Sequence, residues 1–135
     1  MTSLGLEFII KTIKRLKYQL IKMQIKKLKI KPAFEDERGA IYDLLDKENI
    51  HHIGMITSKK GSVRGSHYHK EARQITYVLS GKVELTLKDM NDKNAKPQKF
   101  IMEEGDVVDI PAMVAHSLKA LEDTTFLIFT DKQRA

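Results

Sequence analysis

Two histidines separated by a single residue are the first groups in this chain whose type and spacing suggest chemistry. His67 and His69 flank Tyr68 in a segment that reads as extended. Because side chains alternate between the two faces of a strand, both imidazoles are expected on one face. Such a pair commonly ligates a divalent metal or transfers protons, since imidazole titrates near pH 6.5. An H-x-H sequence taken alone is more often two surface histidines.

The length and composition of the chain limit the classes of protein to which it can belong. A chain of 135 residues with 41% hydrophobic and 31% charged residues is one globular domain's worth of sequence. It contains no cysteine, which excludes disulfides, thiolate metal sites and a cysteine nucleophile. The absence of cysteine fits a reducing compartment, and no secretory signal is recognisable, so a cytoplasmic location is expected.

The net charge of +6 is unevenly distributed. Residues 1–31 contain nine Lys or Arg and one acid, whereas the rest of the chain contains 15 bases and 17 acids. The basic character therefore belongs to an N-terminal extension. Nucleic acid is not expected as a partner, because the body of the protein is nearly neutral.

The extension itself has a helical pattern from Leu6 to Lys22. Apolar residues recur at spacings of three and four with lysines on the opposite face, and no apolar run is long enough to cross a bilayer. The apolar positions are Leu6, Ile9, Ile13, Leu16, Leu20 and Met23. We predict a basic amphipathic helical extension over residues 1–24 and a single domain over residues 25–135.

Three interpretations of this helix remain open. The helix could cover an apolar patch on the barrel or on a partner subunit, which is the ordinary role of such a face. It could instead contact an anionic membrane surface through residues 6–22, an interpretation that rests on composition alone and ranks last. Finally, Met23 could be the true start of the protein, which would make the helix partly an artefact.

After residue 24 the periodicity changes from helical to alternating, which predicts many short strands separated by turns. The expected strands are 27–31, 40–45, 50–57, 74–79, 82–88, 99–102, 107–110, 117–121 and 125–130, with a turn over 34–39. Strands of this length with frequent turns indicate an all-β barrel or sandwich. In this arrangement one of His51 and His52 points inward, and the sequence does not distinguish them.

Two spaced motifs place the histidines within a known fold family. They consist of Gly61, His67, His69, Gln74 and Gly81, followed by Gly105, Pro111 and His116. In this order and with this gap they resemble the cupin superfamily over roughly residues 25–131. The resemblance implies a small antiparallel jelly-roll barrel, a double-stranded β-helix, with the histidines inside and with homodimers as the usual assembly.

Three positions depart from the cupin pattern. Gln74 stands where Glu is usual, Met113 where glycine is usual, and Ala120 where asparagine is usual. A neutral amide in place of a carboxylate leaves a divalent cation without compensating ligand charge, so a metal site here should be weaker. Three histidines can still hold a metal such as Zn, Mn, Fe or Ni.

A closer resemblance points to RmlC-like enzymes that act on nucleotide-linked sugars. The stretch from Arg64 to Gln74 looks like the R-G-x-H-x-H-K-x-x-x-Q segment of the sugar 3,4-ketoisomerases acting on dTDP-4-keto-6-deoxyglucose. The turn from Asp36 to Gly39 matches their early D-x-R-G. The dTDP-4-dehydrorhamnose 3,5-epimerases share R-G-x-H-Y, and the cupin domain of certain capsular-sugar reductases, which holds a metal, is also similar.

The resemblance implies a role for each matching residue. His67 and His69 would be the catalytic acid/base pair, moving a proton alpha to a sugar ketone through an enediol without a cofactor. The substrate-binding residues would be Arg64, Arg38, Gln74 and His116, with the arginines suited to a diphosphate. In the alternative, a divalent transition metal would be held by His67, His69, Gln74 and His116.

Three hypotheses follow. The favoured one is an isomerase or epimerase of a nucleotide-linked 4-keto-6-deoxy sugar, acting without metal. The second is a metal-binding cupin with a different small-molecule activity. The third is a cupin that binds a sugar without turning it over.

Overall fold

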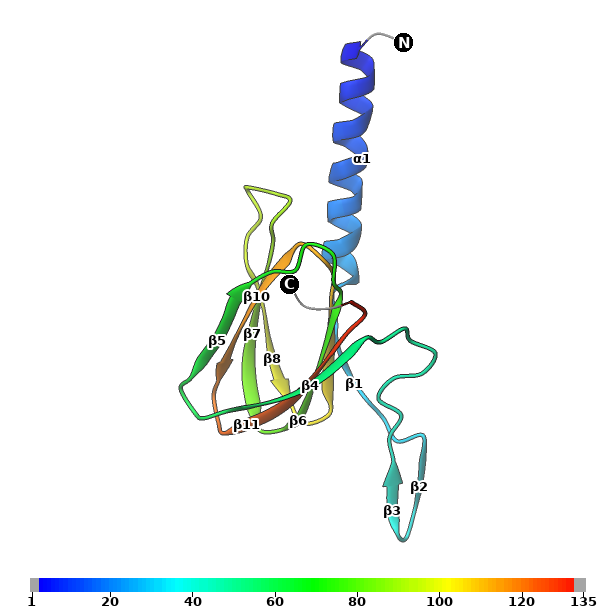
Figure 1. Cartoon of the computed structure of the whole chain (residues 1–135), viewed down its shortest axis with the longest axis vertical. Helices are drawn as coiled ribbons and strands as arrows, with labels where there is room; N and C mark the ends of the chain where they lie inside the picture. The colour runs from blue at the N-terminus through cyan, green and yellow to red at the C-terminus, as the bar shows by residue number, and fades with distance from the viewer. Residues whose placement is uncertain (1–2, 133–135) are drawn as a thin grey trace.

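The computed structural model describes residues 3–132, with the side chains of residues 15–24 excepted. Two antiparallel sheets face each other to form a barrel (Figure 1). The large sheet has the strand order β1 (Lys27–Lys29), β9 (Asp106–Ile110), β6 (Gln74–Ser80), β11 (Thr124–Thr130) and β4 (His52–Ser58). The small sheet has the order β5 (Val63–His67), β10 (Val114–Ala120), β7 (Lys82–Asp89) and β8 (Gln98–Glu103). This arrangement confirms the predicted all-β jelly roll.

Alternating apolar residues on both sheets fill the barrel. Val83, Leu85 and Leu87 of β7 point inward and are almost inaccessible to solvent, as are Phe126 and Ile128 of β11. Because burial of one such side chain contributes about 1.5–3 kcal/mol, this core is the main stabilising element. It fixes which face of each strand points inward, and therefore which polar side chains share the interior.

A second apolar cluster lies on the outer face of the large sheet. Ile75, Tyr77 and Phe129 are buried there beneath Leu44, Leu45 and their neighbours from the segment that precedes β4. Arg73 secures this segment because its guanidinium bonds both Asp109 and Glu48, with closest contacts of 2.6 and 2.8 Å. The large sheet thus carries buried residues on both faces, which explains the continuous buried run at the start of β6.

The expected strand boundaries hold to within a few residues, except near the start of the domain. The predicted turn at 34–39 is itself a hairpin of β2 (Phe34–Asp36) and β3 (Gly39–Ile41), and the predicted strand 40–45 ends at Ile41. The tight turn between them explains the difference: the Asp36 carboxylate accepts the backbone N–H of Arg38 at 2.9 Å, and Gly39 has φ of 135°. The β2–β3 hairpin stands away from the barrel (Figure 1).

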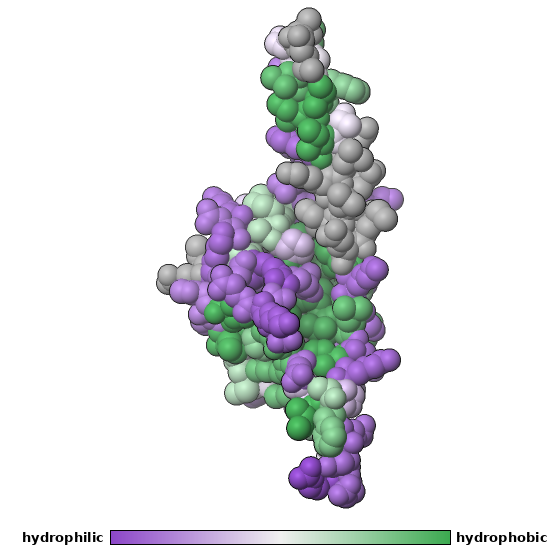
Figure 2. Space-filling view, turned by 90° about the vertical axis from the view of Figure 1, so that its right-hand side faces the viewer, coloured by the Kyte–Doolittle hydropathy of each residue, from purple (hydrophilic) through white to green (hydrophobic). Residues whose placement is uncertain are grey.

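The N-terminal helix α1 (Ser3–Gln24) includes the predicted span and projects away from the barrel (Figure 1). Leu4, Leu6 and Phe8 are between 53% and 75% exposed, and Figure 2 shows apolar side chains uncovered near the outer end of α1. The described side chains of α1 therefore do not cover a patch on the barrel of the same chain. Among the described residues, no helix is long and apolar enough to cross a membrane.

Candidate functional site

The pairing of β5 with β10 brings His67 and His116 together. The two residues are directly opposite in the register, with ring centroids 4.6 Å apart. The close approach requires Gly65, because a Cβ at that position would lie 2.6 Å from the carbonyl oxygen of His116 and because φ is 98°. The close approach of the two strands therefore explains why a glycine follows Arg64 in the sequence.

His69 reaches the cluster from a loop rather than from the expected strand. β5 ends at His67, and the positive φ values of Gly65 and Ser66 break the alternation that predicted a shared strand face. His69 is nevertheless buried, 7% exposed, with its ring centroid 5.3 Å from that of His67 and 5.5 Å from that of His116. The three histidines thus form one cluster, which we call the histidine triad.

Gln74 holds the ring of His69. Its Oε1 lies 3.3 Å from His69 Nε2, and its Nε2 donates to Thr76 Oγ1 at 3.3 Å. Because an amide oxygen only accepts, His69 Nε2 carries the hydrogen in this contact, and Nδ1 keeps its lone pair. His69 Nδ1 is buried without a hydrogen-bond partner in the protein.

His116 is a neutral imidazole in this environment. Burial, together with the neighbouring His67 and His69, lowers its pKa from 6.5 to about 4 despite its bond to Val114. Its Nδ1 lies 3.2 Å from the carbonyl oxygen of Val114, which can only accept, so Nδ1 carries the hydrogen. The lone pair of Nε2 is buried and without a partner in the protein.

Unpartnered buried polar atoms of the described residues all belong to one end of the barrel. They are His52 Nδ1, His69 Nδ1, Asp89 Oδ2, His116 Nε2 and Thr130 Oγ1. The register places them together: Thr130 faces both His52 and Gln74, and Val114, two residues before His116, faces Asp89. Because an unpaired buried polar atom costs about 1–3 kcal/mol, their concentration marks a place where a ligand or solvent supplies partners.

The structure also decides between the two adjacent histidines. His52 is partly buried on the inner face of β4, whereas His51 is exposed. The sequence left this open because Ile53 and Met55, on the outer face, are apolar too and are 64% and 67% exposed. Thr130 was not identified as a site residue from the sequence. Its position could have indicated this, because Thr130 is polar and continues the alternation of the inward-facing Phe126 and Ile128.

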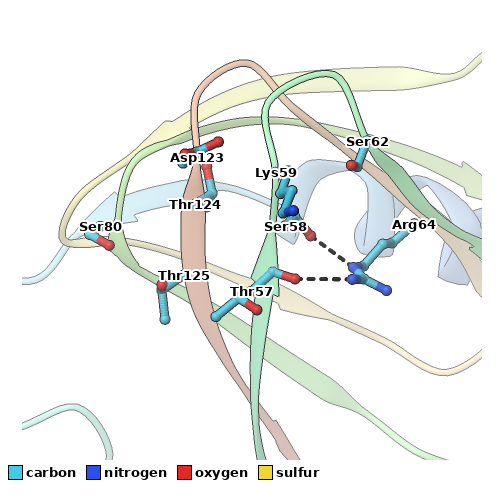
Figure 3. Close-up of a pocket in the computed structure, with 9 residues that line it drawn as sticks. All are labelled: Thr57, Ser58, Lys59, Ser62, Arg64, Ser80, Asp123, Thr124 and Thr125. Atoms are coloured by element: carbon cyan, nitrogen blue, oxygen red, sulfur yellow. Dashed lines mark hydrogen bonds between the residues drawn. The ribbon is translucent and has the colours of Figure 1, made fainter.

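The two predicted arginines lie away from the histidine triad. Arg38 is at the tip of the β2–β3 hairpin, where its guanidinium bonds Asp36 at 2.6 Å and is 80% exposed. Arg64 donates to Ser58 Oγ at 2.8 Å and to the carbonyl oxygen of Thr57 at 3.0 Å, as Figure 3 shows. These bonds tie β5 to β4, and a role for either arginine in substrate binding stays a prediction.

Arg64 lines a polar pocket of about 540 Å³ (Figure 3). Thr57 and Ser58 of this pocket are at the end of β4, and Thr124 and Thr125 are at the start of β11. His52 and Thr130 occupy the opposite ends of the same two strands. The pocket therefore lies at the other end of the barrel from the histidine triad.

The histidine triad has the donor chemistry of a divalent metal site. One ligand nitrogen from each of the three residues lies within 4.8 Å of the others, against about 3.4 Å expected between tetrahedral zinc ligands. His69 Nδ1 and His116 Nε2 both present unpartnered lone pairs. These residues fit a metal, which would be bound by neutral ligands alone because no carboxylate of the described residues joins the cluster.

Comparison with known protein families identifies the family of this chain. The family model of the polysaccharide biosynthesis C-terminal domain matches residues 34–133. The chain belongs to this family. No curated protein matches the sequence of this chain.

Solved structures similar to this polysaccharide biosynthesis C-terminal domain include enzymes of nucleotide-sugar metabolism. The dTDP-4-dehydrorhamnose 3,5-epimerase from Sulfolobus tokodaii has a TM-score of 0.73 and 28% identity, covering 82% of this chain and 72% of the epimerase. The sugar 3,4-ketoisomerase QdtA from Thermoanaerobacterium thermosaccharolyticum, in complex with TDP, has a TM-score of 0.69 and 20% identity over 82% of each chain.

A 3,4-ketoisomerase from Helicobacter canadensis has a TM-score of 0.70 and 22% identity, covering 83% of this chain and 86% of the other. These neighbours confirm the predicted resemblance to RmlC-like cupins. The two ketoisomerases support the fold, and the epimerase adds similarity in sequence.

Proposed function

We propose that this protein is an isomerase or epimerase of a nucleotide-linked 4-keto-6-deoxy sugar. His67 and His69 are the acid/base pair, and the reaction passes through an enediol. The observation that carries the proposal is the state of His69, whose Nε2 is engaged by Gln74 and whose Nδ1 lone pair is buried beside His67. The similar epimerase and ketoisomerase structures support the same general class of activity.

The chemistry needs a base at the carbon next to the ketone. His69 Nδ1 takes the proton from C3, and the C4 ketone oxygen takes a proton from the imidazolium of His67, which gives a neutral enediol. In a ketoisomerase the O3 hydroxyl then gives its proton to His67, and C4 receives the solvent-exchanged proton of His69, so the ketone moves to C3. In an epimerase a solvent proton reaches C3 from the opposite face instead, O4 returns its proton to His67, and His69 releases its proton to solvent. No proton is gained or lost overall in either case.

The remaining predicted residues bind rather than react. Gln74 orients His69, and neutral His116 adds a hydrogen-bond acceptor at Nε2 without adding charge. We assign Arg64 and Arg38 to the nucleotide diphosphate because guanidinium groups bind phosphates in pairs of hydrogen bonds. Since both lie away from the histidine triad, this assignment requires the nucleotide to extend away from the sugar. We also propose a homodimer, since Ile53 and Met55 leave an apolar strip exposed on the edge strand β4.

Hydrogen exchange in deuterated water tests the proposal directly. The whole chain is incubated with dTDP-4-keto-6-deoxyglucose, and the sugar C–H signals are followed by proton NMR. Conversion to the 3-keto sugar with deuterium at C4 identifies a ketoisomerase, whereas exchange at C3 and C5 identifies an epimerase. His67→Gln and His69→Gln should each slow exchange by about a hundredfold or more, since loss of an acid/base group typically costs 10²–10⁴.

His51→Gln is the matched control, because it removes an exposed histidine of the same chain. It should leave the exchange rate unchanged. Equal rates in the His69→Gln variant and in the parent protein would refute the acid/base assignment. Binding of the nucleotide sugar without any exchange would instead point to a non-catalytic sugar-binding cupin.

The metal-binding alternative rests on the convergence of the histidine triad. A divalent transition metal would be held by His67, His69 and His116, with Gln74 as a possible fourth ligand, and would polarise a substrate carbonyl. Metal content measured on protein purified without chelator or added metal distinguishes the two hypotheses. About one equivalent in the parent and none in His116→Ala supports the metal site, and equal content in both proteins contradicts it.

A further inference from the structure

Two polar side chains on the large sheet each have a buried atom without a hydrogen-bond partner in the protein. Thr130 is fully buried at the end of β11, and its Oγ1 has no partner in the protein. His52 is partly buried at the start of β4, and its Nδ1 is inaccessible and also without a partner. Neither residue belongs to the acid/base pair or to its orienting contacts.

The strand register joins these two residues to the histidine triad. Thr130 is directly opposite His52 on one side and directly opposite Gln74 on the other. Gln74 in turn contacts His69 at 3.3 Å. His52, Thr130 and Gln74 therefore form a row across three adjacent strands, which we call the polar row, and one end of this row touches His69.

The local packing also makes room for His52. A Cβ on Gly54 would lie 3.1 Å from Ile128 Cγ1 and 3.3 Å from His52 Cε1, so a larger residue would push the imidazole away. The fold gains nothing from the unpaired atoms, because valine has nearly the shape of threonine and would avoid the cost of a buried hydroxyl without a partner. A bound group that pairs with these atoms accounts for both of them.

We propose that His52 and Thr130 bind hydroxyl groups of the sugar ring and so select its configuration. This inference rests on the proposed function and adds a binding surface that adjoins His69. The threonine hydroxyl both donates and accepts, and an imidazole nitrogen does either according to its tautomer, so the pair matches a sugar hydroxyl. The histidine triad acts on the ketone side of the ring, while the polar row fixes how the ring is presented.

Kinetics with dTDP-4-keto-6-deoxyglucose test this role. Thr130→Val and His52→Leu should raise KM about tenfold and change kcat less than threefold, because they weaken binding without touching the proton-transfer groups. The matched controls are His51→Leu, which alters the exposed neighbour, and Thr86→Val, which alters a partly exposed threonine of β7. Both controls should keep the parent KM.

Thr130→Val should also keep or raise the melting temperature of the protein, since the hydroxyl that it removes has no partner. A raised KM together with an unreduced melting temperature supports the proposal, because simple damage to the fold would lower the melting temperature. An unchanged KM in both Thr130→Val and His52→Leu overturns it.

A crystal structure with a dTDP-linked 6-deoxy sugar that lacks the ketone separates this inference from the reaction. Sugar oxygens within 3.2 Å of Thr130 Oγ1 and His52 Nδ1 support it even if the parent protein shows no turnover, in which case only the isomerase assignment fails. A sugar bound away from both atoms overturns it even if turnover is observed. Absence of any binding overturns it as well.

Discussion

The backbone N–H of Met113 donates a hydrogen bond to the carbonyl oxygen of His69 at 2.8 Å. Met113 adopts this position with φ of 67°, in the left-handed region that favours glycine. Its own carbonyl accepts the N–H of Met90 at 2.9 Å, so the residue anchors the His69 loop to the start of β10 and to the end of β7. The glycine usual at this position in cupins thus has a conformational reason.

Met113→Gly should therefore be more stable than Met113→Ala. A non-glycine residue in the left-handed region costs about 1–2 kcal/mol, partly offset by the greater freedom of glycine in the unfolded chain. We expect the free energy of unfolding to exceed that of Met113→Ala by about 1 kcal/mol, measured by urea denaturation. Met113→Ala is the control because it also removes the side chain but keeps the strained φ, and equal stability of the two variants would contradict the prediction.

Gly65→Ala should open the histidine triad. The added Cβ would meet the carbonyl oxygen of His116 at 2.6 Å, so β5 must move away from β10. We expect a loss of at least about 3 kcal/mol in unfolding free energy, together with lost activity. Gly61→Ala has a similar φ of 88° with nothing within 4 Å of the added Cβ, and should lose only about 1 kcal/mol. Similar losses of unfolding free energy in both variants would show that the close approach of β5 to β10 does not cause the loss in Gly65→Ala.

The buried His116 should make stability depend on pH between 6.5 and 4. Its folded pKa is about 4 because burial disfavours the cation, whereas the unfolded chain protonates this residue near pH 6.5. As the pH falls through this window the unfolded state binds more protons, so the free energy of unfolding decreases, by on the order of 3 kcal/mol in total. Above pH 6.5 both states are neutral and the dependence disappears.

Urea denaturation at several pH values checks this slope. His116→Leu should flatten the stability curve between pH 6.5 and 4, because it removes the group whose protonation differs between the states. His51→Leu should leave the slope as in the parent protein, since His51 is exposed. A parent-like slope in His116→Leu would assign the pH dependence to other groups.

Gln74→Glu should strengthen metal binding at the histidine triad. The substitution places a carboxylate at a buried position that now contacts His69, and a carboxylate compensates part of a divalent cation's charge. We expect affinity for Zn²⁺, measured by calorimetric titration, to rise at least about tenfold. Gln98→Glu adds the same charge on β8 and should not change the affinity, whereas an equal increase in both variants would indicate a nonspecific charge effect.

The amino-acid sequence by itself determined the fold and the members of the histidine triad. Alternation such as Val83, Leu85 and Leu87 specifies a strand with one buried face, and turns at glycines such as Gly81 divide the chain into short strands. The two spaced motifs then identified His67, His69, Gln74 and His116 as candidates, which the structure brings together. Periodicity predicts the strands because alternation acts over only a few residues, whereas the site residues came from the resemblance of the two motifs to cupins.

Only the tertiary structure decided how each of these side chains is used. The loop position of His69 depends on the positive φ values of Gly65 and Ser66. The inward direction of His52 and the unpaired hydroxyl of Thr130 depend on the register between distant strands. The same holds for Arg38 and Arg64, which the sequence placed near the substrate and which the structure ties to Asp36 and Ser58. Whether a polar atom is buried with a partner or without one depends on residues far apart in the chain, so only the packed structure settles it.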